Sequence, residues 1–70
     1  MMREPVASSN IASVGYDAPS ETLEVEFQNG TVYQFYNISQ GIYDQFMEAS
    51  SKGKFFSTYI KNAYPYSRVG

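Results

Sequence analysis

The feature that most constrains the fold is residues 22–37, TLEVEFQNGTVYQFYN, which have the pattern of a β-hairpin. Apolar Leu23, Val25 and Phe27 alternate with polar side chains up to Asn29-Gly30, and a second run rich in β-branched and aromatic residues follows. Alternation with a period of two on both sides of Asn-Gly is one of the strongest hairpin signals in a single sequence. We therefore expect two antiparallel strands here.

Two turn geometries fit Asn29-Gly30, and they bury different aromatic side chains. A two-residue type I′ turn places Tyr33 and Phe35 on the face opposite the apolar side chains of the first strand. A three-residue loop, with Gly30 left-handed as a G1 bulge, shifts the register by one and brings Tyr33 and Phe35 to the apolar face. The bulged turn is favoured because it keeps Gln34 out of the core and unites five large apolar side chains.

The composition excludes several kinds of functional site. The chain has 70 residues and contains neither cysteine nor histidine. It therefore lacks disulfides, thiolate ligands, thiol nucleophiles and imidazole bases, and we expect neither a metal nor another cofactor. A chain of this length forms one domain that buries about 60 % of its unfolded surface. Its seven tyrosines and five phenylalanines supply the large side chains that so small a core needs.

The residues before the hairpin predict one further strand. Residues 10–17 (NIASVGYD) contain three spaced apolar side chains, and their alternation is imperfect around Gly15. A glycine inside a strand often marks a bulge or a close backbone approach. Residues 18–21 (APSE) have turn chemistry, so the three strands are expected to form an antiparallel meander.

The residues after the hairpin predict two helices. Apolar side chains recur three and four apart within residues 40–51, with Ser39 as the N-cap and Gly53 as the residue that ends the helix. The same spacing in residues 54–63 predicts a shorter helix that stops before Pro65. Packing the meander against these helices gives a small two-layer α+β domain, with a three-stranded antiparallel meander followed by two short helices.

The two ends of the chain carry weaker patterns. Residues 1–9 are polar, so we expect a flexible lead-in to a single domain at residues 10–66, with residues 67–70 as a tail. No run approaches the roughly 20 apolar residues that a membrane span requires, and the N-terminus lacks the apolar stretch of a signal peptide. These features predict a cytoplasmic protein with no membrane partner and no evident small-molecule substrate.

Five short pieces of the chain have the spacing of a known family. They are Ser9-Asn10-Ile11, Val14-Gly15-Tyr16-Asp17, Leu23-x-Val25-x-Phe27-x-x-Gly30-x-x-Tyr33-x-Phe35, Ala49-x-Ser51-x-Gly53-x-Phe55-Phe56 and Tyr64-Pro65-Tyr66-x-Arg68. Together they resemble the KTSC domain, a module at the C-terminus of some lysyl-tRNA synthetases and a short stand-alone protein of bacteria and phages. The family's Tyr-x-Tyr pattern has Phe35 as its second member here, which removes one hydroxyl. The resemblance implies an uncharacterised domain for which RNA binding has been suggested.

Tyr33 and Phe35 are the aromatic motif of that family. In the bulged register they lie on the helix-facing side of the sheet, and we interpret them as core aromatics. The alternative is an exposed platform on which bases stack, at about 1–3 kcal/mol per base. Glu24 and Glu26 beside an exposed platform would repel phosphate, which favours the core interpretation.

Positive charge is concentrated after Ser51. Residues 1–51 carry one arginine and all seven acidic groups, whereas residues 52–70 carry four basic groups and no acidic one. Basic side chains interleaved with aromatic rings combine phosphate neutralisation with stacking. A solvated helix face is the commoner reason for such lysines, and a pI of about 4.8 argues against a dedicated nucleic-acid binder. The candidate RNA-binding residues are Lys52, Lys54, Lys61, Arg68, Tyr59, Tyr64 and Tyr66.

Glu24 and Glu26 are the one carboxylate pair with a spacing that hydrolysis could use. They lie two apart on one strand, about 6.5–7 Å between Cα atoms. No histidine, second acidic cluster or nucleophile–base pair supports catalysis, so we interpret the pair as part of a solvated sheet face. The chain is predicted not to be an enzyme.

Two functional hypotheses follow from the sequence. The first is a weak RNA-binding accessory module that uses the basic C-terminal segment. The second is a protein-interaction or homodimerisation module that uses exposed aromatics or a sheet edge. Residues 32–36 are all neutral, and in a plain meander their strand is an edge unless the N-terminal strand or a helix covers it. If the strand is an edge, it invites pairing with another chain, which predicts a concentration-dependent dimer.

Overall fold

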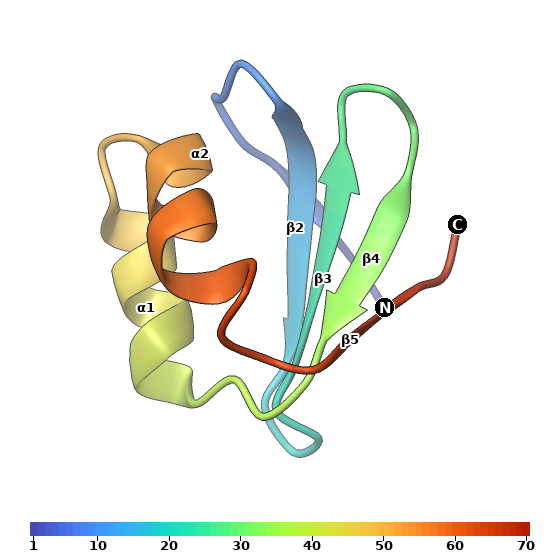
Figure 1. Cartoon of the computed structure of the whole chain (residues 1–70), viewed down its shortest axis with the longest axis vertical. Coiled ribbons are helices and arrows are strands. Elements are labelled where there is room, and N and C mark those ends of the chain that lie inside the picture. Colours follow the sequence, from blue (N-terminus) through green and yellow to red (C-terminus); the bar gives the residue numbers. More distant parts are fainter.

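The computed structural model describes all 70 residues as a two-layer α+β domain with one antiparallel sheet (Figure 1). The strands follow one another across the sheet in chain order, and the helices cover one face of it. The strands are β1 (Glu4–Pro5), β2 (Ile11–Asp17), β3 (Thr22–Phe27), β4 (Val32–Phe35) and β5 (Tyr66–Arg68). The helices are α1 (Gln40–Glu48) and α2 (Lys52–Phe55), and α2 continues into a π-helical segment, η1 (Phe56–Ile60). None of these helices has the length and apolar character needed to cross a membrane.

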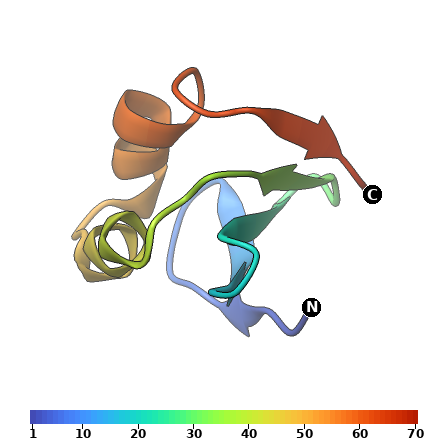
Figure 2. The same ribbon diagram turned by 90° about the horizontal axis from the view of Figure 1, so that it is seen from below.

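The sheet has two strands more than the three-stranded meander predicted from the sequence. β1 pairs with β2, with Glu4 opposite Val14, and β5 pairs with β4, with Tyr66 opposite Phe35. Figure 2 shows these two short strands at opposite edges of the sheet. The prediction of three strands is wrong because strands of two and three residues are too short to show a readable alternation.

The prediction that residues 32–36 form an edge strand is wrong as well. β5 covers the outer side of β4, and beyond β5 the N–H of Val69 donates to the carbonyl of Val32 at 2.8 Å. The strand on which the predicted dimer depended is therefore already paired within the chain.

The hairpin turn adopts the bulged geometry. Leu23 lies opposite Phe35 and Val25 opposite Tyr33, which is the register that a three-residue loop produces. Gly30 has a φ of 90°, a value that glycine adopts without the steric cost of a Cβ atom. Tyr33 and Phe35 consequently lie on the same face of the sheet as the apolar side chains of β3.

A bulge in β2 explains its imperfect alternation. The register shifts between Ile11 and Ser13, so that Ile11 and Val14 both reach the core although they are three residues apart. The bulge does not lie at Gly15, but the close backbone approach expected there is present. A Cβ atom on Gly15 would lie 2.5 Å from the carbonyl oxygen of Met2, because the chain leading into β1 passes over this residue.

The core lies between the helices and the inner face of the sheet. Phe46 from α1 and Ile60 from η1 are completely buried, whereas Phe27 and Tyr33 are half-buried and pack against the core from its margin. The buried apolar residues are Ile11, Val14, Leu23, Val25, Phe35, Ile38, Phe46, Phe56 and Ile60.

Serine side chains cap both helices. Ser39 accepts a hydrogen bond from the N–H of Ile42 at 3.3 Å, as the sequence predicts. Ser51 likewise accepts from the N–H of Lys54 at 3.3 Å, so the second helix begins earlier than predicted. Gly53 therefore lies inside the second helix, and the prediction that it ends the first is wrong.

Candidate nucleic-acid interface

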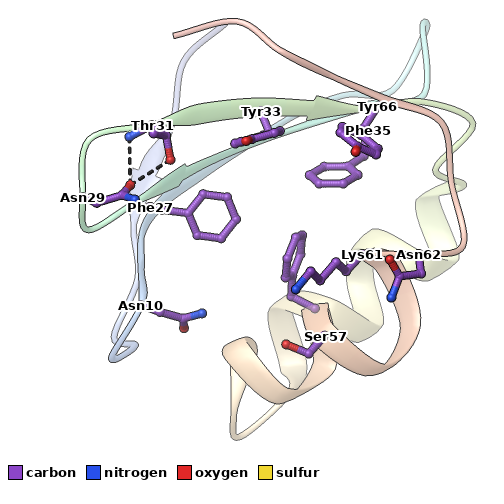
Figure 3. A pocket seen from close by; sticks show the side chains of 11 residues that line it. Asn10, Phe27, Asn29, Thr31, Tyr33, Phe35, Ser57, Lys61, Asn62 and Tyr66 are labelled. Atoms are coloured by element: carbon purple, nitrogen blue, oxygen red, sulfur yellow. Dashed lines mark hydrogen bonds between the residues drawn. The ribbon is translucent and has the colours of Figure 1, made fainter.

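A groove of about 380 Å³ opens between the sheet and the second helix (Figure 3). The β3–β4 hairpin and β5 form one side, and η1 with the residues after it forms the other. The residues that line it are Asn10, Phe27, Asn29, Thr31, Tyr33, Phe35, Phe56, Ser57, Lys61, Asn62 and Tyr66.

Five aromatic rings form a continuous floor for this groove. The ring of Phe56 meets those of Phe27 and Phe35 edge-on, with centroids 5.4 and 5.2 Å apart. Tyr33 lies 5.9 Å from both Phe27 and Tyr66. Tyr66 is 60 % exposed, so its ring offers a free face on which a planar group can stack.

Lys61 supplies the positive charge of the groove. It follows η1, is exposed, and directs its ammonium group into the groove between the helix and the hairpin (Figure 3). A lysine ammonium is a donor without acceptor capacity. An anionic group beside the aromatic floor would therefore be neutralised here.

A second, more polar hollow adjoins the groove and shares Asn10 and Ser57 with it. Lys52 and Lys54 line this hollow among serine and threonine side chains. Its lining residues are Ala7, Ser8, Ser9, Asn10, Ser50, Ser51, Lys52, Gly53, Lys54, Ser57 and Thr58. The two hollows make one surface, aromatic at one end and hydroxyl-rich at the other.

Charge is sharply segregated on this surface. All three lysines of the chain line the two hollows, whereas none of its seven aspartates and glutamates does. A surface with one sign of charge attracts ligands of the opposite sign even when the net charge of the whole chain is unfavourable. The net charge of −2 therefore does not describe the field at this surface.

Glu24 and Glu26 lie on the other face of the sheet and are tied into hydrogen bonds. Glu24 is buried and accepts from Arg3 and from the Gln34 amide, and Glu26 accepts from the Ser13 hydroxyl at 2.8 Å. Burial by itself would raise the pKa of Glu24, but the hydrogen bonds from Gln34 and Arg3 and the charge of Arg3 lower it below its usual value. This pair holds the N-terminal segment on the sheet. No group of three or more acidic side chains is placed to hold a metal ion.

The structure brings together some of the predicted site residues and separates others. Lys61 and Tyr66 meet Tyr33 and Phe35 around the groove, because β5 places Tyr66 opposite Phe35. Lys52 and Lys54 line the adjoining hollow. Arg68, Tyr59 and Tyr64 line neither hollow. Arg68 donates to the carbonyl of Gly70, the ring of Tyr59 packs at a tilt against that of Phe55, and Tyr64 packs against the core.

The structure therefore fits the core interpretation for Phe35, whereas Tyr33 lies partly in the core and partly at the surface of the groove. Phe35 is 3 % exposed and belongs to the core, whereas Tyr33 is half-buried and also lines the groove. Reasoning from the sequence did not single out Asn10, Ser57 or Asn62. Asn10 lies in the first piece that resembles the KTSC domain and Asn62 directly follows Lys61, but only the fold brings Asn10 to the groove beside Ser57 and Lys61.

Comparison with known proteins decides the family. A sequence profile of the KTSC domain matches residues 7–64. The chain belongs to the KTSC domain family.

Several known proteins resemble this chain over most of its length. The crystal structure of a KTSC domain protein from Yersinia pestis superposes with a TM-score of 0.93 at 38 % identity, covering 99 % of this chain and 97 % of that one. An uncharacterised protein of Stutzerimonas stutzeri is 34 % identical over 70 residues, 99 % of each chain. A lysine–tRNA ligase of Trichormus variabilis is 30 % identical over 61 residues, which are 87 % of this chain and 11 % of the ligase.

Four of the five pieces of sequence that resemble the KTSC domain meet at the two hollows. Asn10 comes from the first piece, Tyr33 from the hairpin, Gly53 and Phe56 from the second helix, and Tyr66 from the last strand. These pieces are far apart in the chain, and the fold gathers them around one surface (Figure 3).

Proposed function

We propose that this KTSC domain is a non-enzymatic RNA-binding accessory module, and that single-stranded RNA lies along the two adjoining hollows. The observation that carries the proposal is the separation of charge on this surface. Every lysine of the chain and no carboxylate lines it, and five aromatic rings form the floor of the hollow that contains Lys61.

This arrangement meets both requirements of single-strand recognition. An unpaired base needs an aromatic face on which to stack, and Tyr66 and Tyr33 supply it. The phosphates that flank the base need positive charge without nearby carboxylates, which Lys61, Lys52 and Lys54 supply. The likeness to part of a lysine–tRNA ligase, a protein whose name states that it acts on tRNA, adds support for RNA as the ligand.

The overall acidity of the chain makes the binding weak and dependent on salt. At 0.1 M salt, interactions between exposed charges are screened beyond about 10 Å, so the acidic groups on distant faces act only weakly on phosphates bound near the lysines. At lower ionic strength those acidic groups also repel the phosphates, so the affinity is set by two opposing fields.

A titration of labelled single-stranded RNA with the protein at low salt tests the proposal. We expect saturable binding that Lys61→Gln weakens, because it removes the charge within the groove. Arg68→Gln is the matched control, since Arg68 is also exposed and basic but lines neither hollow. Absence of binding, or equal losses in both variants, would contradict the proposal and favour the protein-interaction hypothesis.

A further inference from the structure

A chain of side-chain hydrogen bonds crosses the outer face of the sheet, which is the face turned away from the helices. The guanidinium of Arg3 donates to the carboxylate of Glu24, and the amide nitrogen of Gln34 donates to the same carboxylate at 2.9 Å. The hydroxyl of Tyr36 donates to Oε1 of Gln34 at 3.2 Å and lies 2.6 Å from the hydroxyl of Ser67. The chain of bonds therefore runs from the N-terminal segment to β5 at the opposite edge of the sheet (Figure 2).

The ion pair at one end sets the direction of the bonds that follow. An ionised carboxylate only accepts hydrogen bonds, so the amide of Gln34 turns its nitrogen toward Glu24 and its oxygen toward Tyr36. That oxygen takes the single proton of the Tyr36 hydroxyl, and Ser67 must then be the donor to Tyr36. The bond between the two hydroxyls thus has one defined donor and one defined acceptor.

Ser67 and Tyr66 are neighbours on β5, and their side chains point to opposite faces of the sheet. Ser67 lies opposite Gln34 in β4, on the outer face. Tyr66 lies opposite Phe35, and its ring reaches the groove on the helix-facing side (Figure 3). The hydrogen bond from Ser67 to Tyr36 therefore holds the strand that presents Tyr66.

The place of the Tyr66 ring depends on this strand. β5 has only three residues, and it is an edge strand with a paired neighbour on one side. The ring of Tyr66 meets those of Tyr33 and Phe35 at angles of 49° and 35°, so it lies flat on neither. With the ring 60 % exposed, the position of its free face follows the position of the β5 backbone.

We infer that Tyr36 and Ser67 are positioning residues of the RNA groove, because their hydrogen bond holds β5 against β4 and thereby keeps Tyr66 in place for a base to stack on. This inference rests on the proposed function and adds to it two residues that line neither hollow. A stacking ring that is already in place has less freedom to lose on binding. The affinity for RNA should therefore depend on two hydroxyls that the RNA does not touch.

Titration of labelled single-stranded RNA with Tyr36→Phe and Ser67→Ala tests this inference. Each variant removes one hydroxyl and leaves the residues that line the groove unchanged. We expect each to weaken binding about three- to tenfold, the range of one hydrogen bond, and the double variant to be no weaker than either, since the same bond is lost in all three. The slope of log K against log salt should stay the same, because no charge is removed.

Amide hydrogen exchange measures the hold on β5 without RNA. The N–H of Val69 donates to the carbonyl of Val32 just beyond β5. In Tyr36→Phe this N–H should exchange faster than in the native chain, because the strand beside it opens more often.

A cycle with Tyr66→Ala distinguishes positioning from a general loss of stability. In that background Tyr36→Phe should weaken binding no further, because the ring that it positions is gone. Tyr16→Phe is the matched control: it removes a tyrosine hydroxyl that also makes a 2.6 Å hydrogen bond, to the carbonyl of Ile38, outside both hollows. It should leave the RNA affinity unchanged, and circular dichroism establishes that each variant is folded.

Two outcomes would overturn the role of Tyr36 while leaving RNA binding intact. One is an affinity of Tyr36→Phe equal to that of the native chain, and the other is a loss that persists in full in the Tyr66→Ala background. Failure of the native chain to bind RNA would overturn the proposed function and this inference with it.

Discussion

Removing Arg3 should destabilise the whole domain, although this residue lies outside the strands predicted from the sequence. Its guanidinium donates to the carboxylate of Glu24 and, through Nε, to the hydroxyl of Ser13 at 3.0 Å. Glu24 is 7 % exposed and accepts otherwise only from Gln34. Arg3→Ala therefore leaves a buried carboxylate without its counter-charge.

The expected loss follows from these contacts. A hydrogen bond to a charged group contributes about 1.5–3 kcal/mol, and an unpaired buried charge costs at least as much. A domain stabilised by about 0.05–0.15 kcal/mol per residue would lose a large fraction of its free energy of unfolding. Arg68→Ala is the matched control, because Arg68 is exposed and its Nε donates only to the carbonyl of Gly70. It should cost less than about 0.5 kcal/mol.

The pH dependence of this stability loss distinguishes the contribution of the Arg3–Glu24 charge pair from that of side-chain packing. The pKa of Glu24 is lowered in the folded state, so its contribution is present above the unfolded pKa of about 4.3 and is lost as the pH falls through the folded value. Urea unfolding followed by circular dichroism should give a large difference between native and Arg3→Ala chains at about pH 7 and a smaller one at about pH 3. An equal difference at both values, or none at neutral pH, would refute the reasoning.

Three other predictions follow from the fold and the groove. Gly30→Ala should cost about 1 kcal/mol or more in thermal unfolding, since its φ is 90°; an equal loss in Asn29→Ala would contradict the bulged turn. Phe46→Ala should cost about 3–5 kcal/mol and Phe27→Ala less, because Phe46 is completely buried and Phe27 is not; urea titrations showing the reverse order would contradict this core. Tyr66→Ala should weaken RNA binding without changing its salt dependence, because stacking releases no counterions; a changed slope would contradict this.

The central strands could be predicted because their pattern is local. Alternation on both sides of Asn29-Gly30 defined the hairpin, and the polar Gln34 decided between the two turns. The outer strands β1 and β5 could not be predicted, because a strand of two or three residues shows no periodicity. Such a strand is held in place by contacts with residues far away in the sequence. Arg3 holds the first strand on the sheet through Glu24. The last strand pairs with β4, and there the ring of Tyr66 packs 5.7 Å from that of Phe35.

The candidate site was predictable in its chemistry but not in its geometry. The sequence identified lysines interleaved with aromatics as the basic segment, and the groove contains Lys61 and Tyr66 from that set. It gave no reason to join them to Tyr33, because β5 was not expected to pair with β4. Gly53 was interpreted as a helix terminator, whereas the space it leaves is occupied by Asn10, a contact between residues more than forty positions apart.

The salt dependence of RNA binding tests the central claim most directly. Labelled single-stranded RNA should be titrated from about 50 mM to about 200 mM salt with the native chain and with a variant in which Lys52, Lys54 and Lys61 are all replaced by glutamine. If the three lysines each neutralise one phosphate, log K against log salt has a slope of about −2 for the native chain, from roughly −0.7 per phosphate, and close to zero for the variant. A native slope near zero, or a slope that survives the triple replacement in a folded chain, would contradict the account.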